Sequence, residues 1–428
     1  MIGSGPVPIV LATGGADWEP DLLGRLADRP EVTVVRRCVD LADLLATAGA
    51  GLARAALVAD SLHRLDRDTI ARLRREDVAV VGLLDPADDA GTARRLASIG
   101  VQTVLAATAP VADVVAALRA AVAEAVPHSA DSRVDLGDLA ASASQPVQVE
   151  PGRVVAVWGA AGSGRTTLAV NVAAEVAAAG TSTMLADADT YGASVAQTLG
   201  LLDEAPGLAA AARAANQGTL EVAGLARHAR QVGEELRVLT GLPRADRWPE
   251  LRPAALDQVW SLARSLVMIT VVDCGFSLER HEEIAFDVAA PRRNAATIVS
   301  LEHADTVLVV GTADPIGLQR LIRGLRELRE AVPGADVRVV VNRVRRSVGG
   351  GDGRQGPASV LRRHAGVEHV WSVPDNVDAV DAALMAGRPL IDVAPRSPVR
   401  QAIKAIALEL APAASAARHR SRHRSARR

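Results

Sequence analysis

Short apolar runs and helical patterns alternate along the first 125 residues of the chain. Five runs are rich in Val, Ile and Leu, and the segments between them carry apolar residues at i, i+3 and i+4, the spacing of one helix face. This alternation predicts a parallel sheet with helices on both faces. The predicted strands cover residues 8–13, 32–37, 55–60, 78–84 and 101–107.

A second, larger α/β pattern follows a change of composition. Residues 126–151 are rich in Ser, Asp, Ala and Pro and have little periodicity, which predicts an interdomain linker. Residues 152–411 resume the alternation, and their near-continuous apolar strands predict a mostly parallel sheet buried on both faces. Residues 412–428 are rich in Arg and low in complexity, which predicts a disordered tail. The predicted strands of this larger part cover residues 154–158, 182–187, 235–241, 268–273, 306–312, 337–342 and 369–374.

Composition narrows the class of protein. Lys and Arg together number 48 against 50 Asp and Glu, which argues against a globally basic nucleic-acid-binding protein and leaves open a local basic patch. Two cysteines, Cys38 and Cys274, are too few for a disulfide scaffold or a cysteine zinc site, and they fit a cytoplasmic protein. The chain starts without a signal-peptide pattern and has no apolar run of transmembrane length, so any membrane contact is expected to be peripheral.

The most specific motif joins a Val-rich strand to an Ala-rich helix. The connecting residues read GAAGSGRTT, the phosphate-binding pattern G-x-x-x-x-G-K-T with Arg in place of Lys. Its glycines allow backbone N–H groups to converge on phosphates, and the helix N-terminus adds partial positive charge. Without a ligand, the same residues would form a plain strand-to-helix turn. The predicted phosphate-binding residues are Gly159, Gly162, Ser163, Gly164, Arg165, Thr166 and Thr167.

Polar residues stand where several of the other predicted strands end. The run VMITVVD ends in Asp273, and an apolar strand ending in an acid is typical of the Walker B carboxylate beside a metal ion. Ligands bind at the carboxyl ends of strands in such sheets, so these positions predict one shared site, although each would also suit a solvated turn. The other strand-end residues are Asp187, Asp189, Asn342, Arg343, Pro374 and Asp375.

Taken together, the loop and the strand ends resemble the MinD/ParA family of deviant Walker ATPases, over residues 152–405. The resemblance implies a P-loop NTPase domain that binds ATP and Mg²⁺. It implies Asp189 as the catalytic carboxylate that orients the attacking water, with Arg165 as its partner in catalysis. It further implies that the metal is held by Thr166, Asp187 and Asp273, and that the base is lined by Asn342, Arg343, Pro374 and Asp375.

Two departures from the family pattern concern positive charge. The Walker lysine position holds Arg165, and the family's signature lysine falls on Ala160. The planar fork of arginine is bulkier than an ammonium group, so it is no neutral replacement. Because phosphoryl transfer depends on placed positive charge, we expect nucleotide binding to be weak and hydrolysis to be slow or absent.

The first 125 residues resemble the flavodoxin-like receiver fold in size and strand count. Asp60 ends the third predicted strand, where a receiver is phosphorylated, but the acidic pair after the first strand and the lysine after the fifth are absent. We therefore expect no phosphoryl transfer to Asp60 and a role in protein interaction or dimerisation.

A receiver-like domain without the phosphorylation residues, joined to a MinD/ParA-like ATPase, resembles the CpaE/TadZ group. The resemblance implies a homodimer that positions or recruits an assembly at a cell site, most simply tight-adherence pilus assembly. Residues 377–407 also resemble septum-site-determining relatives, so division-apparatus partners, chromosome partitioning and a nucleotide-free scaffold stay open. The Arg-rich tail leaves open a contact with anionic membrane or, less favoured, with nucleic acid.

Overall fold

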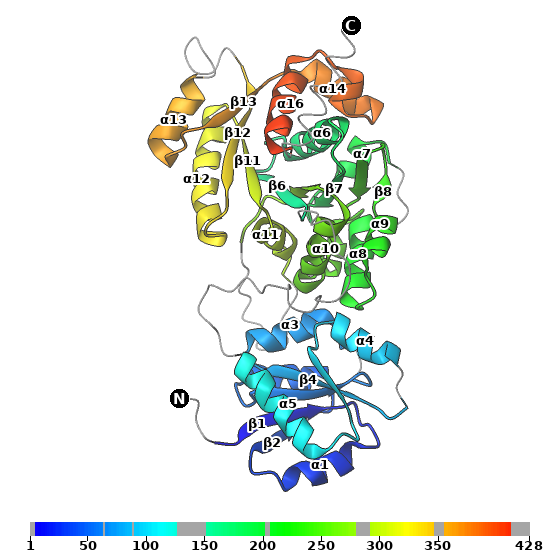
Figure 1. Cartoon of the computed structure of the whole chain (residues 1–428). Helices are drawn as coiled ribbons and strands as arrows, with labels where there is room; N and C mark the ends of the chain where they lie inside the picture. Colours follow the sequence, from blue (N-terminus) through cyan, green and yellow to red (C-terminus); the bar gives the residue numbers. More distant parts are fainter. Residues whose placement is uncertain are drawn as a thin grey trace, which may run out of the picture. The chain divides into compact units, whose positions relative to one another are not determined.

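The computed structural model describes residues 5–62, 65–87, 90–125, 151–201, 206–279, 292–345 and 355–411. The chain divides into two compact units, formed mainly by Met1–Glu150 and by the residues from Pro151 onwards (Figure 1). The predicted linker, apart from Pro151, and the predicted Arg-rich tail lie outside the described residues.

The first unit is built on a five-stranded parallel sheet of order β2-β1-β3-β4-β5, the flavodoxin-like order. All five strands predicted here are present. The strands are β1 Val7–Ala12, β2 Val32–Arg37, β3 Ala55–Ala59, β4 Ala79–Leu84 and β5 Thr103–Ala106. The helices are α1 Glu19–Ala27, α2 Leu41–Gly49, α3 Arg67–Arg75, α4 Ala90–Ser98 and α5 Val111–Glu124.

Alternation along β1 explains how this sheet is covered on both faces. Ile9 and Leu11 join a buried cluster with residues of α1 and α5, whereas Val10 and Ala12 join another with residues of α2 and α3. Successive side chains of a strand point to opposite faces, so one short apolar run supplies both clusters.

The acid at the end of β3 is already engaged. Arg95 of α4 donates from Nη1 to Asp60 and from Nη2 to the carbonyl of Leu65, the latter at 3.0 Å. The guanidinium therefore neutralises the carboxylate at the position that a receiver would phosphorylate. The absence of phosphoryl transfer to Asp60 stays a prediction.

The second unit is built on an eight-stranded sheet of order β13-β12-β11-β6-β10-β7-β9-β8, parallel except for β8. All seven predicted strands are present, and the two-residue β8 was not predicted because so short a segment has no periodicity. The strands are β6 Arg153–Gly159, β7 Thr183–Ala188, β8 Arg230–Gln231, β9 Leu236–Leu239, β10 Ile269–Cys274, β11 Thr306–Thr312, β12 Val337–Val344 and β13 Val370–Pro374.

Helices cover both faces of this sheet (Figure 1). They are α6 Arg165–Ala178, α7 Val195–Thr198, α8 Gly207–Asn216, α9 Val222–His228, α10 Pro253–Leu266, α11 Ala295–Glu302, α12 Pro315–Ala331, α13 Gln355–Ala365, α14 Val377–Ala386, α15 Leu390–Val393 and α16 Pro398–Leu410, with a 3₁₀ helix at Ala245–Glu250.

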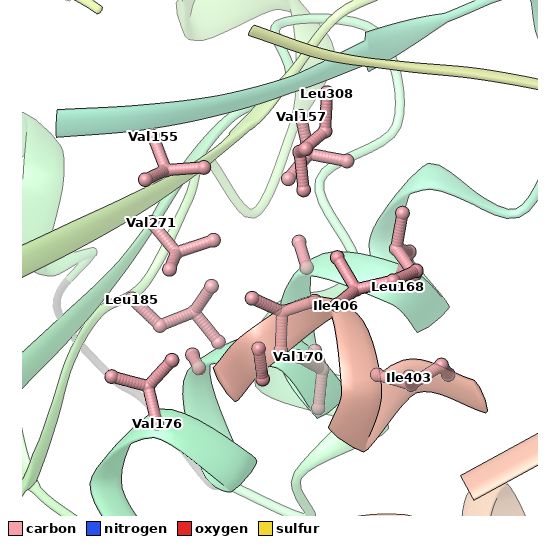
Figure 2. Packing of buried hydrophobic residues seen from close by; sticks show 14 of the residues in the cluster. Val155, Val157, Leu168, Val170, Val176, Leu185, Val271, Leu308, Ile403 and Ile406 are labelled. Carbon is pink, nitrogen blue, oxygen red and sulfur yellow. The ribbon is translucent and has the colours of Figure 1, made fainter. Parts of the chain in front are cut away.

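The core of the second unit lies between the central strands and the helices α6 and α16 (Figure 2). Val155 and Val157 of β6 pack here with Val170 of α6 and Ile406 of α16, and all four are at most 2% exposed. Burying a side chain of this kind stabilises the fold by about 1.5–3 kcal/mol. This packing sets the start of α6 against the carboxyl end of β6, where the phosphate-loop motif lies.

Candidate nucleotide site

The phosphate-loop motif connects the central strand β6 to α6. Two of its positions require glycine for steric reasons. Gly162 and Gly164 have φ of +78° and +91°, a region that L side chains rarely adopt. A Cβ on Gly164 would also collide with Nδ2 of Asn342. Among the described residues no side chain caps helix α6, which begins at Arg165, so its first N–H groups are suited to donate to a phosphate.

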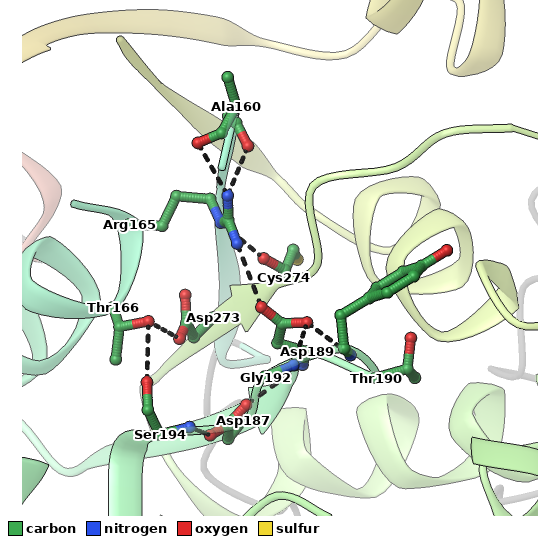
Figure 3. A network of polar contacts seen from close by, with 12 residues as sticks. Ala160, Arg165, Thr166, Asp187, Asp189, Thr190, Gly192, Ser194, Asp273 and Cys274 are labelled. Carbon is green, nitrogen blue, oxygen red and sulfur yellow. Dashed lines mark hydrogen bonds and ion pairs between the residues drawn. The ribbon is translucent and has the colours of Figure 1, made fainter. Parts of the chain in front are cut away.

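Arg165 is turned into the protein (Figure 3). Its Nη1 donates to the carbonyls of Gly159 and Ala160 at 2.7 and 2.9 Å, and its Nε donates to the carbonyl of Cys274 at 3.0 Å. Nη2 pairs with Oδ2 of Asp189 at 3.1 Å, and both side chains are less than 10% exposed. The guanidinium thus joins the phosphate loop to the ends of β7 and β10, and it would have to give up some of these contacts to meet a phosphate.

Asp189 organises the turn after β7. Its Oδ1 accepts from the backbone N–H groups of Tyr191 and Gly192 at 2.8 and 3.2 Å, while Oδ2 pairs with Arg165. Both carboxylate oxygens are therefore engaged. Of the two residues predicted to be catalytic, each holds the other in place.

Two further aspartates face each other across β7 and β10. Asp187 and Asp273 are register partners, each 1% exposed. The hydroxyl of Thr166 donates to Oδ2 of Asp273 at 2.6 Å, while Oδ1 of Asp273 is buried and has no hydrogen-bond partner within the described residues. A bare carboxylate oxygen at this place fits a water molecule or a metal ion.

Magnesium fits this corner only together with phosphate. Mg²⁺ requires octahedral oxygen ligands and is usually bound by one or two carboxylates, waters and substrate phosphates. In the part of the chain that the structure describes, no group of three or more His, Cys, Asp and Glu side chains is placed to hold a metal. Thr166, Asp187 and Asp273 would therefore hold an ion whose remaining ligands come from phosphate and water.

Burial raises the pKa values of both Asp187 and Asp273. It raises the pKa of Asp187 to about 6, although the N–H groups of Val195, Asp189 and Ser194 donate to this carboxylate and oppose the rise. Burial, followed by the nearby charge of Asp187, raises the pKa of Asp273 well above its usual range. A bound cation would lower both pKa values, because it stabilises the charged forms of the two carboxylates.

The raised pKa of Asp187 predicts a pH dependence of stability. Between pH 3.8 and about 6 the folded chain keeps a proton that the unfolded chain has lost. The folded state then binds more protons, so its stability falls as the pH rises through this window. In magnesium-free buffer, the wild type should lose up to about 3 kcal/mol relative to Asp187→Asn between pH 4 and 6.5. Urea unfolding of both proteins measures this difference, and a pH-independent difference would contradict it.

The four residues predicted to line the base lie around one cavity of about 150 Å³. Asn342 donates from Nδ2 to the carbonyl of Ser163 at 2.9 Å, which ties β12 to the phosphate loop. Arg343 follows in a left-handed conformation with φ of +54°. The lining also includes Pro374, Asp375, Gly164 and Thr167.

A second cavity of about 360 Å³ shares Arg343 and Asp375 with the first and continues past the phosphate loop. Its walls include residues 160–163 of the loop and the start of α12. The hydroxyl oxygen of Ser163 is buried and has no hydrogen-bond partner in the described part of the chain. The two cavities have the arrangement that an elongated ligand with a base at one end and phosphates at the other requires.

Sequence reasoning missed the contribution of α12. Asp314 caps this helix by accepting from the N–H of Gly317 at 3.0 Å, and Thr312, Asp314, Gly317 and Arg320 line the second cavity. The signal was present, because an Asp-Pro pair after a strand marks a helix start. The pair belongs to no phosphate motif, so nothing in the sequence linked it to the site.

A buried asparagine that sequence reasoning also missed ties two loops of the site together. Asn294, at the start of α11, accepts from the hydroxyl of Tyr191 at 2.8 Å. It donates to Oγ of Ser277 at 3.1 Å and to the carbonyl of Glu279 at 2.7 Å. The loops after β7 and β10 are thereby coupled through one side chain, which no local pattern could indicate.

Comparison with known proteins rests on structure alone. No protein-family model matches the chain, and no curated protein matches it in sequence. None of the described helices is long and apolar enough to span a membrane.

Several solved structures resemble the chain in fold. A ParA family ATPase from Chlorobium tepidum TLS aligns with a TM-score of 0.50 and 18% identity, over 60% of this chain and 98% of that one. The septum site-determining protein MinD of Pyrococcus horikoshii OT3, complexed with Mg-ADP, aligns with a TM-score of 0.48 and 17% identity, over 60% and 96% of the two chains. A putative plasmid partition protein of Borrelia burgdorferi B31 bound to AMPPNP aligns with a TM-score of 0.43 and 12% identity, over 60% and 99%. The predicted α/β fold class is confirmed: the chain contains a mostly parallel sheet with the P-loop NTPase fold, which it shares with the ParA family ATPase.

Proposed function

We propose that the second unit binds ATP with Mg²⁺ as a member of the MinD/ParA ATPases. The observation that carries this proposal is the pair of cavities along the phosphate loop, which share Arg343 and Asp375 and are lined at one end by the predicted base residues and elsewhere by residues 160–163. The uncapped start of α6 and the unpartnered oxygen of Asp273 support it, because each lacks a group that Mg-nucleotide would supply.

Isothermal titration with ATP and ADP, with and without Mg²⁺, tests this proposal. We expect binding that weakens when Mg²⁺ is removed and a loss of that Mg²⁺ dependence in Thr166→Val, which lacks the hydroxyl. Thr33→Val, on an exposed position of β2 in the first unit, is the matched control and should bind as the wild type does. No heat of binding at millimolar nucleotide would overturn the proposal and favour a nucleotide-free scaffold.

Slow or absent hydrolysis is the second part of the proposal. Support comes from the ion pair between Arg165 and Asp189, in which each predicted catalytic residue is occupied by the other. A carboxylate held by a guanidinium and two N–H groups is a weak acceptor for a water proton. The missing charge at Ala160 acts in the same direction.

The cellular role proposed for this nucleotide-binding unit is to position or recruit an assembly, most simply a tight-adherence pilus, as a homodimer. The first unit supports it indirectly, because its strand order suits a receiver-like module while Arg95 occupies the Asp60 carboxylate. A ParA-like partition or septum-site role is the competing candidate, supported by the shared fold with a ParA family ATPase.

Imaging a fluorescent fusion in the source cell separates these roles. A focus at one pole that coincides with the pilus machinery is the expected result. A band at mid-cell would point to septum placement, and a pattern that follows the nucleoid would point to partitioning; either would replace the pilus role.

A further inference from the structure

One arginine of α12 lies between two cavities at the phosphate loop. Arg320 lines the 360 Å³ cavity described above, together with residues 160–163. It also lines a larger cavity of about 730 Å³, bounded by Trp158, Phe276 and the same Ala160–Ala161 segment. Arg320 therefore stands beside the part of the loop where Ala160 replaces a lysine.

Arg320 has no acid beside its guanidinium on its own helix. In the part of the chain that the structure describes, its side chain makes no hydrogen bond or ion pair, whereas Arg323, one turn along, pairs with Glu327 at 3.2 Å. The reason is local, since Arg320 has Ile316 and Gly317 one turn before it and Arg323 and Gly324 one turn after it, so no acid lies at a neighbouring helical position.

Close packing holds α12 beside the loop. A Cβ on Gly324 would lie 3.1 and 3.4 Å from ring atoms of Trp158, so glycine lets the helix approach β6 closely. The N-terminal end of α12 is fixed by the Asp314 cap. The backbone that carries Arg320 is therefore held at both ends, one on each side of the arginine.

Other charged side chains also line the 360 Å³ cavity. Asp314 is held by the N–H of Gly317 and by the hydroxyl of Thr312. Arg343 is shared with the base cavity, so it lies toward the base end, and Arg345 lies 3.8 Å from Asp375 and is partly neutralised. Arg165 is engaged by protein acceptors. Arg320 is absent from the base cavity and is free to meet an anion at the far end.

We propose that Arg320 binds the terminal phosphate of a nucleoside triphosphate and supplies in this chain the positive charge that Ala160 lacks. The inference rests on the proposed function, since it names the residue that distinguishes a nucleoside triphosphate from a diphosphate at the same site. Arginine suits this task, because its guanidinium can donate two parallel hydrogen bonds to phosphate oxygens. The buried hydroxyl of Ser163 in the same cavity offers a further donor.

The test compares ATP with ADP, both with Mg²⁺, by isothermal titration of the full chain. Arg320→Gln should weaken ATP binding about tenfold and ADP binding less than about twofold, since only ATP reaches this position. Arg320→Lys should keep most of the preference for ATP. Arg326→Gln, an exposed arginine of the same helix that lines none of these cavities, is the matched control and should change neither affinity.

The possible results are distinct. Equal weakening of ATP and ADP, or no change in either, with a wild-type unfolding midpoint, would overturn the role of Arg320 and leave nucleotide binding standing. If the wild type itself binds neither nucleotide, the proposed function fails and this inference fails with it.

Discussion

Replacing Arg165 by methionine is expected to lower the free energy of unfolding of the second unit by about 3 kcal/mol. The substitution keeps most of the apolar stem but removes every donor. The carbonyls of Gly159, Ala160 and Cys274 would lose their guanidinium partner, and Asp189 would be left buried without its cation. Asp189 keeps two backbone N–H donors, which places the loss at the lower end of the range for buried ion pairs.

Urea unfolding followed by tryptophan fluorescence measures this loss, because four of the five tryptophans belong to the second unit. The matched control is Arg323→Met, which breaks an ion pair with 77% and 50% of its side chains exposed. That pair should contribute no more than about 0.5 kcal/mol. If the two substitutions lower the free energy of unfolding by the same amount, the contacts of Arg165 do not stabilise the fold.

Arg165→Lys keeps the positive charge but removes the planar guanidinium. One ammonium group cannot reach all four acceptors, so we expect part of the stability loss seen with methionine. The lysine would also hold Asp189 less tightly and would place a compact charge in the loop. We therefore expect steady-state ATP hydrolysis to rise modestly in Arg165→Lys. It should rise further when Ala160→Lys is added. Unchanged or lower rates in both variants would mean that the loop carries out no phosphate chemistry.

Gly159→Ala is expected to lower the free energy of unfolding by about 3 kcal/mol or more, which is the upper end of the range for overpacking. Gly159 and Val310 are register partners on β6 and β11, and a Cβ on Gly159 would overlap the carbonyl oxygen of Val310. The obstacle is backbone in the middle of the sheet, so it can move only by parting the two strands.

The control for this prediction lies three residues along the same loop. Gly162 has φ of +78°, but no atom of the described residues lies within 4 Å of its Cβ position, so Gly162→Ala should lower the free energy of unfolding only by the strain of the left-handed conformation, about 1–2 kcal/mol. Urea midpoints of the two variants give the comparison. A larger loss for Gly162→Ala than for Gly159→Ala would show that the strand contact tolerates the extra methyl group.

The site combines local features that were predictable with contacts that were not. The phosphate loop and the acids at the ends of β7 and β10 were predicted because strand-to-helix loops and strand ends are local in sequence. The pairing of Arg165 with Asp189 and with Cys274 joins residues 24 and 109 positions apart. Such contacts depend on which strands lie next to β6, and the apolar pattern of parallel strands does not state their order.

The sequence by itself determined the α/β class, the five strands of the first unit and seven strands of the second, and it indicated the phosphate loop and the polar strand ends, because hydrophobic periodicity and glycine positions act over a few residues. Only the tertiary structure decided that β6 lies between β10 and β11, that Arg165 is bound by protein rather than left free for phosphate, and that α12 brings Arg320 beside the loop. The physical reason is that side-chain partners are chosen by the packing of whole helices and strands, which brings together donors and acceptors that share no local pattern.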